Sequence, residues 1–237
     1  ILLSIFFISV LLLFLSTGVW IALSMIGVST IAMTLFTSRP VGDAMATTIW
    51  GTSSSWTLTA LPLFVWMGEI LFRTKLSENL FEGLSPWMQK LPGGLIHVNV
   101  VGCALFAAIS GSSAATVATV GKMSIPELRK RNYPEKILLG SLAGSGTLGL
   151  LIPPSIILII YGVTVQESIA KLFVAGIIPG IMIALIFMGY VILWSLFNKK
   201  EMPNIVNQYS FIDKIKKSGQ LIPVIILIVS VIGSIYT

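Results

Sequence analysis

The apolar residues of this chain fall in long runs that are separated by short polar segments. A hydrocarbon core about 30 Å thick requires roughly 20 apolar residues in a helix. On this measure the sequence predicts membrane-spanning helices in the ranges 1–15, 18–37, 56–72, 173–197 and 219–237. The first run has neither a basic start nor a small-residue cleavage site, so we interpret it as a span and not as a signal peptide.

Two further apolar segments, 94–122 and 135–163, do not fit a single straight span. The first is too long for one span and too short for two, and small hydroxyl residues lie at its middle. The second contains several glycines followed by Pro153 and Pro154. Proline removes a backbone donor and clashes with the preceding turn, and glycine adds backbone freedom. We therefore predict a re-entrant helical hairpin over the first segment and a broken transmembrane helix over the second.

The Lys and Arg residues are divided very unequally by this topology. If 94–122 enters and leaves on the same side, 13 of the 15 Lys and Arg residues face one side, and only Arg39 and Lys171 face the other. Positively charged loops stay in the cytoplasm, so this division favours the re-entrant hairpin. A full crossing would place the basic cluster at 122–136 opposite the one at 73–90.

Composition agrees with this interpretation and narrows the function. Apolar residues make up 55% of the chain and charged residues 10%, which is typical of an integral membrane protein and not of a soluble core. The net charge of +6 is explained by topology, so we expect the lipid bilayer and no nucleic acid as a partner. Cys103 is the single cysteine, which excludes an intrachain disulfide. Because the chain starts and stops inside apolar runs, we expect it to be part of a longer protein.

The hairpin tip and the break carry the candidate chemistry. Irregular backbone at membrane depth is tolerated only where it is buried in protein or lines a watery cavity. Helix N-terminal ends favour anions, whereas freed carbonyls and C-terminal ends coordinate sodium. The predicted sodium and substrate residues are Ser110, Gly111, Ser112, Ser113, Thr116, Gly146, Thr147, Gly149, Pro153 and Pro154. We expect Na⁺ itself at Ser110, Ser112, Ser113, Gly146 and Thr147, because hard oxygen ligands suit it, and we expect no organic cofactor.

A simpler interpretation of the same residues remains open. Gly111 and the nearby alanines would then serve only close helix packing, and the two prolines would only kink a span. Three polar residues have similar alternatives. Glu69 is one turn from Arg73 and is expected to pair with it rather than to couple ions. His97 is expected to cap or pack, and Asn99 to serve the backbone of the hairpin.

Four stretches of the chain resemble the large membrane (M) subunit of tripartite ATP-independent periplasmic (TRAP) transporters. They are LPLFVWMGEILF at 61–72, FAAISGSSAATVATVG at 106–121, KMSIPELRKRNYPEK at 122–136 and GSLAGSGTLGLLIPPSI at 140–156. The resemblance extends from about residue 18 to about residue 200. It identifies the chain as the N-terminal half of a subunit that is about twice as long and contains two inverted repeats. The second hairpin and the second broken helix of that family are missing here.

The resemblance implies a fold class and a division of the chain. The fold is an all-α integral membrane protein, one half of an inverted-repeat, elevator-type transporter. Its parts are scaffold helices at 1–74, an amphipathic interfacial helix at 75–92, half of a transport domain at 93–163, a transmembrane helix at 164–200, a cytoplasmic connector at 201–218 and the start of another span at 219–237. The sequence pattern itself also predicts the amphipathic helix, because apolar residues recur near helical spacing between Lys75 and Leu91 with charged residues between them. In the family the hairpin tip and the break bind sodium beside the substrate.

The resemblance also implies a function and partners. The function is sodium-coupled symport of an organic acid anion, such as a C4-dicarboxylate or sialic acid, across the bacterial inner membrane. The partners are a small membrane (Q) subunit and a periplasmic substrate-binding protein. The sequence does not name the acid. The alternatives are a passive channel or scaffolding subunit and, with less support, an intramembrane serine hydrolase that uses Ser110 with His97 as its base. The chain contains no acid placed to orient that base, so we predict that it is not an enzyme.

Overall fold

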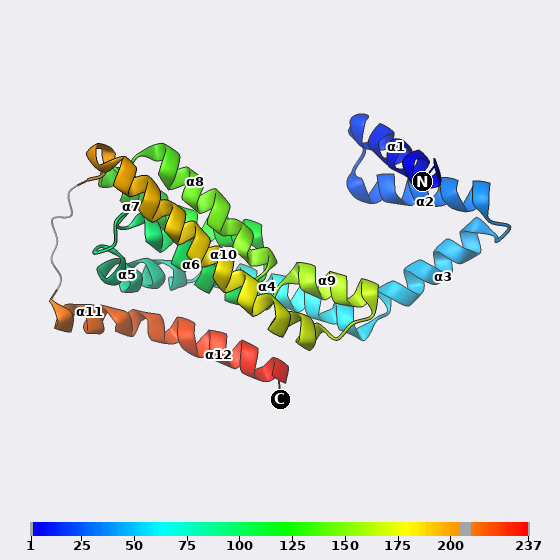
Figure 1. The fold of residues 1–237 in the computed structure, drawn as a ribbon. Coiled ribbons are helices and arrows are strands. Elements are labelled where there is room, and N and C mark those ends of the chain that lie inside the picture. The colour runs from blue at the N-terminus through cyan, green and yellow to red at the C-terminus, as the bar shows by residue number, and fades with distance from the viewer. Residues whose placement is uncertain (1, 204–209, 237) are drawn as a thin grey trace. The chain divides into compact units, whose positions relative to one another are not determined.

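A computed structural model describes residues 2–203 and 210–236 (Figure 1). Every regular element in these two ranges is a helix. The chain divides into two compact units, residues 1–55 and residues 56–237, which are described separately. The all-α expectation is thus confirmed for the part of the chain that the structure describes.

The first unit contains three helices: α1 (Leu2–Ser16), α2 (Ile21–Phe36) and α3 (Val41–Ser53). The rings of Phe7 and Phe36 meet edge to face with 5.6 Å between their centroids, so α1 and α2 are antiparallel. Both correspond to predicted spans. The third helix was not predicted from the sequence, because its apolar residues alternate with threonine and glycine and do not form a long run.

The second unit starts with a 3-10 turn, η1 (Trp56–Thr59), then α4 (Ala60–Phe72) and the surface helix α5 (Leu76–Met88). The polar face of α5 is exposed at Glu78 and Glu82. Its apolar face, at Leu80, Phe81 and Leu84, is buried and belongs to the same core cluster as α6. The amphipathic pattern predicted this helix, but its apolar face packs on protein.

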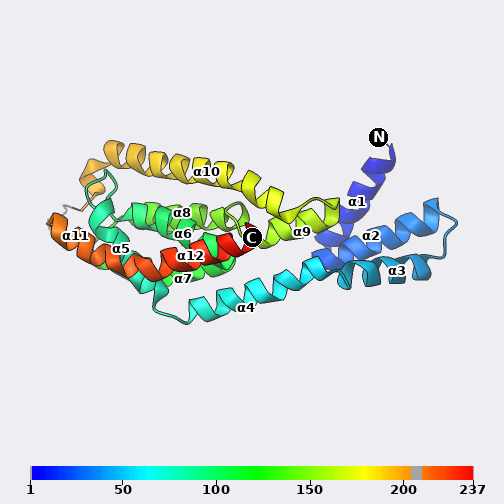
Figure 2. The ribbon, with the colours of Figure 1, turned by 90° about the horizontal axis from the view of Figure 1, so that it is seen from below.

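The hairpin consists of α6 (Ile96–Ser110) and α7 (Ser113–Lys130), which are joined by Gly111 and Ser112. Helix α8 (Glu135–Gly146) packs against both, and the three helices lie side by side in Figure 2. Most of α6 is buried. At the other end of the hairpin, the amide of Leu95 donates to Tyr133 Oη over 3.1 Å, which ties the turn between α7 and α8 to the start of α6.

The segment after α8 is interrupted where the glycines and prolines lie. Helix α8 ends at Gly146, a 3-10 turn η2 (Thr147–Leu150) follows, and α9 (Ile156–Val165) begins after the two prolines. Next comes α10 (Ile169–Phe197), whose 29 residues start before the predicted range 173–197.

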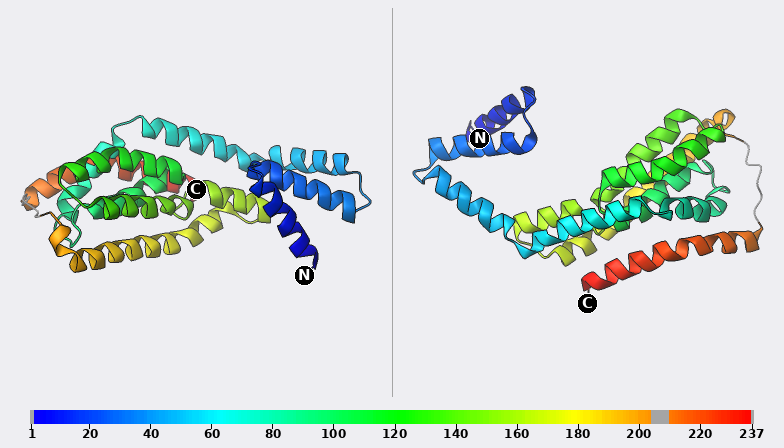
Figure 3. Two further views of the ribbon diagram at one scale, coloured as in Figure 1. Left: turned by 90° about the horizontal axis from the view of Figure 1, so that it is seen from above. Right: turned by 180° about the vertical axis from the view of Figure 1, so that it is seen from behind.

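The chain ends with η3 (Lys199–Glu201), α11 (Phe211–Ser218), η4 (Gly219–Leu221) and α12 (Ile222–Tyr236). Part of the predicted connector, 204–209, lies outside the described residues. The last three elements continue as one rod in Figure 3. Two helices of the described residues, Ile169–Phe197 and Phe211–Ser234, are long and apolar enough to cross a membrane, and five shorter ones are apolar.

Candidate functional site

The tip of the hairpin is a tight turn stabilised by its own hydroxyl groups. Gly111 has φ +60°, a left-handed conformation that glycine adopts at little cost, and so allows α6 to end and the chain to reverse. Ser112 caps α7, and its Oγ accepts from the amide of Ala115 over 3.4 Å. Ser110 Oγ and Thr116 Oγ1 lie 2.9 Å apart in the buried interior of the turn. These hydroxyls therefore face one another across the tip.

The break after α8 meets this tip through backbone. The carbonyl oxygen of Gly111 accepts a hydrogen bond from the amide of Ile156 over 3.2 Å. A Cβ atom at Gly111 would lie 2.8 Å from the carbonyl oxygen of Pro154. A side chain at Gly111 would therefore push the tip away from the start of α9.

Two further close approaches join the end of α8 and η2 to the start of α7. A Cβ atom at Gly149 would lie 2.9 Å from the backbone nitrogen of Ser113. One at Gly146 would overlap Cγ2 of Val117. The structure thus brings together the two predicted parts of the site, and glycine is needed at each contact because backbone or branched side chains fill the space of a side chain.

Four helix ends converge at this contact. Helices α6 and α8 end there, and α7 and α9 begin there. The C-terminal ends carry partial negative charge from free carbonyls, and the N-terminal ends carry partial positive charge from free amides. A cation and an anion can therefore be held next to each other by backbone dipoles, with the hydroxyls of Ser110 and Thr116 as further oxygen ligands.

Other predicted site residues have different surroundings. Thr147 is exposed, and its Oγ1 donates to the carbonyl of Gly144 over 2.7 Å. Its carbonyl belongs to the 3-10 turn. Ser113 Oγ is buried and has no hydrogen-bond partner among the described residues. Pro153 and Pro154 are joined by a cis peptide bond.

Two residues near the site were missed by the sequence analysis. Ser155, the residue before α9, is buried, and its Oγ donates to the carbonyl of Leu150 over 2.7 Å, which closes the break on itself. A serine directly before an apolar run is a known helix-start signal and could have revealed it. A Cβ atom at Gly68 of α4 would lie 3.5 Å from the carbonyl of Ser110, so α4 passes beside the tip.

The structure also shows the surroundings of Glu69, His97 and Asn99, the three polar residues for which the sequence suggested alternative roles. Arg73 Nε lies 2.8 Å from Glu69 Oε1, which confirms the expected pair. His97 is buried, and its Nε2 lies 2.8 Å from the carbonyl oxygen of Pro92, as expected for a capping or packing histidine. Asn99 Nδ2 donates to the carbonyl of Leu138 over 3.2 Å, so it joins α6 to α8 and does not serve the backbone of the hairpin itself.

Comparison with known proteins gives the family. The family model of the tripartite ATP-independent periplasmic transporter, DctM component, matches residues 8–237. The chain belongs to this family. It is 33% identical over 194 residues to the C4-dicarboxylate TRAP transporter large permease protein DctM of Pseudomonas aeruginosa, covering 82% of this chain and 45% of that protein.

Two further relatives carry names with other solutes. The isethionate TRAP transporter permease protein DctMQ of Oleidesulfovibrio alaskensis is 35% identical over 178 residues, which is 75% of this chain and 28% of that protein. The sialic acid TRAP transporter permease protein SiaT of Haemophilus influenzae is 38% identical over 135 residues, which is 57% of this chain and 22% of that protein. This chain therefore spans less than half the length of these relatives.

Membership of the DctM family settles two points. The chain is a membrane protein, in agreement with its apolar helices. The family consists of transporters and not of enzymes, which agrees with the prediction from the sequence. The geometry also argues against the hydrolase. Ser110 and His97 lie 13 residues apart on α6, which separates them by roughly 20 Å along the helix at 1.5 Å per residue.

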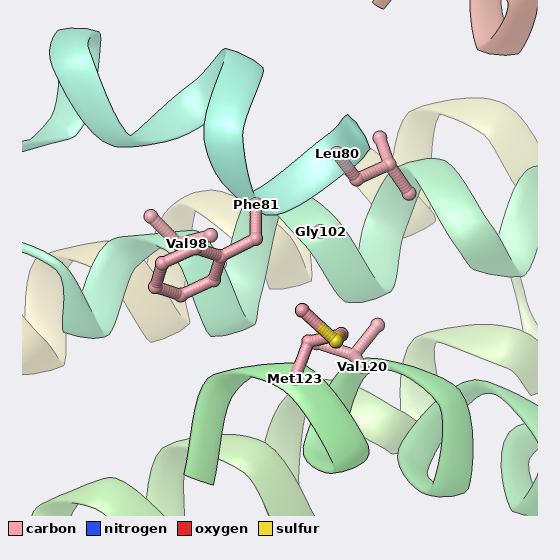
Figure 4. Close-up of a pocket in the computed structure, with 6 residues that line it drawn as sticks. All are labelled: Leu80, Phe81, Val98, Gly102, Val120 and Met123. Atoms are coloured by element: carbon pink, nitrogen blue, oxygen red, sulfur yellow. The ribbon is translucent and has the colours of Figure 1, made fainter. Parts of the chain in front are cut away.

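Two cavities among the described residues are alternative candidate sites for an acid. A cavity of about 10 Å³ lies between α5, α6 and α7 (Figure 4). It is lined by Leu80, Phe81, Val98, Gly102, Val120 and Met123. This space is apolar and no larger than one water molecule needs. In the first unit, a cleft of about 560 Å³ between α2 and α3 has no charged side chain in its lining. The only polar side chains in its lining are Ser29 and Thr48, so neither cavity offers a positive charge to an organic anion.

Proposed function

We propose that this chain is the N-terminal half of the large subunit of a sodium-coupled symporter for an organic acid anion. The observation that carries the proposal is the convergence of two helix C-termini and two helix N-termini at the contact between Gly111 and Pro154. Such an arrangement favours a cation and an anion in neighbouring positions. The cation and the anion then partly neutralise each other before they move through the bilayer together.

The sodium ion is proposed to lie between the tip and the break. A dehydrated cation of this size needs about six oxygen ligands. The tip offers the hydroxyls of Ser110, Ser112, Ser113 and Thr116, and the break offers carbonyls between Gly146 and Pro154. In the described part of the chain, no group of three or more His, Cys, Asp or Glu residues is placed to hold a metal, so the ligands would be hydroxyls and backbone carbonyls.

The substrate anion is proposed to lie at the N-terminal ends of α7 and α9. The amides of Ile156 and Ala115 already donate to Gly111 and to Ser112 Oγ, so the remaining amides of these first turns would donate to a carboxylate or sulfonate. The names of these three relatives support this class, because C4-dicarboxylates, isethionate and sialic acid are all acids. They differ in size and in acidic group, so the relatives support the class and not one particular solute.

Coupling between sodium and substrate would follow because neither the tip nor the break is a complete binding site. Neither part supplies enough oxygens alone, so binding of the ion requires the contact between them and stabilises it. The transport domain, residues 93–163, is compact and neutralised when it carries both the ion and the substrate. In that form it is more stable than when it carries the ion alone. Such differential stabilisation is what an elevator-type movement requires.

The proposed setting is a three-part transporter in the bacterial inner membrane. A small Q subunit is supported by the name DctMQ of one relative. A periplasmic substrate-binding protein is supported by the family description, which names a tripartite periplasmic transporter. The second half of the large subunit would supply a second hairpin and the remaining ligands.

The test is uptake by the full-length protein, reconstituted with its small subunit and binding protein in proteoliposomes. A C4-dicarboxylate, a sulfonate and sialic acid should each be offered with an inward sodium gradient and with potassium in place of sodium. We expect one of these acids to accumulate above its external concentration with the sodium gradient and not with potassium. Uptake that stops at equal concentrations would favour the passive channel, and the absence of uptake would favour a scaffolding subunit.

A further inference from the structure

The surface helix α5 and the rod formed by α11, η4 and α12 are joined by side-chain bonds. Trp87 Nε1 donates to Ser218 Oγ over 2.7 Å. Gln220 Nε2 donates to Glu82 Oε2 over 2.9 Å. The partners are 131 and 138 residues apart in the sequence. The contact therefore connects the helix before the hairpin to the segment that follows α10.

The side chain of Leu221, the residue after Gln220, also contacts α5. A Cβ atom at Gly83 would lie 2.6 Å from Cγ of Leu221, so the side chain of Leu221 rests directly on the backbone of α5. Beside it, Lys214 Nζ lies 5.5 Å from the centroid of the Trp87 ring, within the range of a cation–π interaction. Lys214 is only 8% exposed, so its stem is packed as well as its charge.

The contact continues into the hydrophobic core. Leu80 of α5 is 2% exposed and Val224 of α12 is fully buried, and both belong to one core cluster. Leu221 packs against the same cluster. Closely packed interiors resist gradual deformation, because small separations already lose many contacts. A contact of this kind resists sliding and opens only as a whole.

We propose that Glu82, Gly83, Trp87, Ser218, Gln220 and Leu221 form a fixed joint, the α5–η4 joint, that stays closed in every state of the transporter. The joint makes α5 a brace on the start of α12. Movement of the hairpin must then occur without separation of α5 from α12. This inference rests on the proposed function only in that the transporter adopts several conformational states. The contacts that form the joint do not involve the sodium site.

A disulfide across the joint tests it. The distance at Gly83 places its Cβ position within about 4 Å of Leu221 Cβ, which suits a disulfide. Gly83→Cys and Leu221→Cys would be combined in the full-length transporter with Cys103→Ala. We expect the same oxidation rate with and without sodium and substrate, and uptake by the oxidised protein within about twofold of the reduced protein. A sodium effect of more than about tenfold on the oxidation rate, or loss of uptake that a reductant restores, would show that the joint opens.

A stability measurement keeps the inference separate from the proposed function. Gly83→Val places methyl groups on Leu221, whereas Gly140→Val in α8 meets nothing within 4 Å. We expect Gly83→Val to lower the unfolding temperature in detergent clearly more than Gly140→Val does. Equal shifts of the unfolding temperature in the two variants would contradict the packed joint, whatever the uptake assay shows. If the wild-type transporter shows no sodium-driven uptake but the two variants differ, the proposed function fails and the packed contact at the joint stands.

Discussion

The carbonyl oxygen of Gly111 and the amide nitrogen of Ile156 are joined by a hydrogen bond of 3.2 Å. This bond links the last residue of a helical turn to the first residue of α9, which are 45 positions apart. It is possible because Gly111 has no side chain and the prolines hold the preceding backbone away from helical geometry. The two irregular segments of the chain therefore satisfy part of each other's backbone.

Replacing Gly111 should disrupt the site most strongly. In Gly111→Val, the new Cβ atom would meet the carbonyl oxygen of Pro154 at 2.8 Å, and φ +60° is strained for a branched residue. We expect the half-maximal sodium concentration for uptake to rise by more than roughly tenfold, which is about 1.4 kcal/mol. Gly140→Val is the matched control, because no atom lies within 4 Å of that position. Equal sodium dependence in both variants would place the ion elsewhere.

Hydroxyl removal at the tip should weaken sodium binding without abolishing transport. Ser110 Oγ and Thr116 Oγ1 are 2.9 Å apart and buried, so Ser110→Ala or Thr116→Val removes one of the proposed oxygen ligands. We expect the half-maximal sodium concentration to rise by roughly fivefold, since one hydrogen-bonding group contributes about 1 kcal/mol. Thr164→Val in α9 is the control, because its hydroxyl bonds within its own helix. An unchanged value in both tip variants would contradict the assignment.

Ser112 and Thr147 extend this series. Ser112 Oγ caps α7, so Ser112→Ala should cost stability as well as sodium affinity. Thr147 Oγ1 donates within its own turn and is exposed, so Thr147→Ala should change the sodium dependence less than Ser110→Ala does. Thermal unfolding in detergent beside sodium titration of uptake separates the two effects. A larger sodium effect from Thr147→Ala than from Ser110→Ala would move the ion towards η2.

Lys90 and Lys122, which lie at the two ends of the predicted hairpin segment 94–122, should be accessible from the same side of the membrane. Lys90 precedes α6 and Lys122 lies near the middle of α7, and both are exposed. Single cysteines at these positions, with Cys103→Ala, should react with an impermeant maleimide from the cytoplasmic side in inverted vesicles. Reaction from opposite sides would exclude the re-entrant topology, because each crossing reverses the side of the membrane.

Tyr133 should make stability depend on pH in the alkaline range. Its hydroxyl lies in the turn between α7 and α8 and accepts from the amide of Leu95 over 3.1 Å. Burial raises the pKa of Tyr133, and the Leu95 bond and the charge of Arg131 offset part of this rise. The neutral phenol is therefore favoured in the folded protein. Its contribution should be complete below pH about 10 and should decrease above it, as the unfolded chain ionises first.

The measurement is thermal unfolding of wild type and Tyr133→Phe in detergent from pH 8 to pH 11. At pH 8 we expect the variant to be less stable by about 1 kcal/mol, because the amide of Leu95 loses its partner. Above pH 10 the difference should shrink. A constant difference across the range would mean that the Tyr133 hydroxyl does not titrate with folding.

The sequence by itself determined where helices form and where they cannot. Long apolar runs predicted α1, α2, α4, α10 and α12, since helices in a bilayer must bury their backbone. The glycines and the prolines after Gly146 predicted the interruption, because their effects on backbone are local. The pair of Glu69 and Arg73 followed from spacing alone, since residues four apart are neighbours on one helix face.

Only the tertiary structure decided which segments meet. The sequence pattern of α5 predicted an apolar face. It did not predict that α6 and α12 cover this face, because the lipid and the protein interior are equally apolar. Asn99 was expected to serve its own hairpin and bonds α8 instead. The contact of Gly111 with Pro154 joins residues 43 positions apart. Local preferences fix the conformation of each segment, whereas such long-range contacts depend on packing that no single segment encodes.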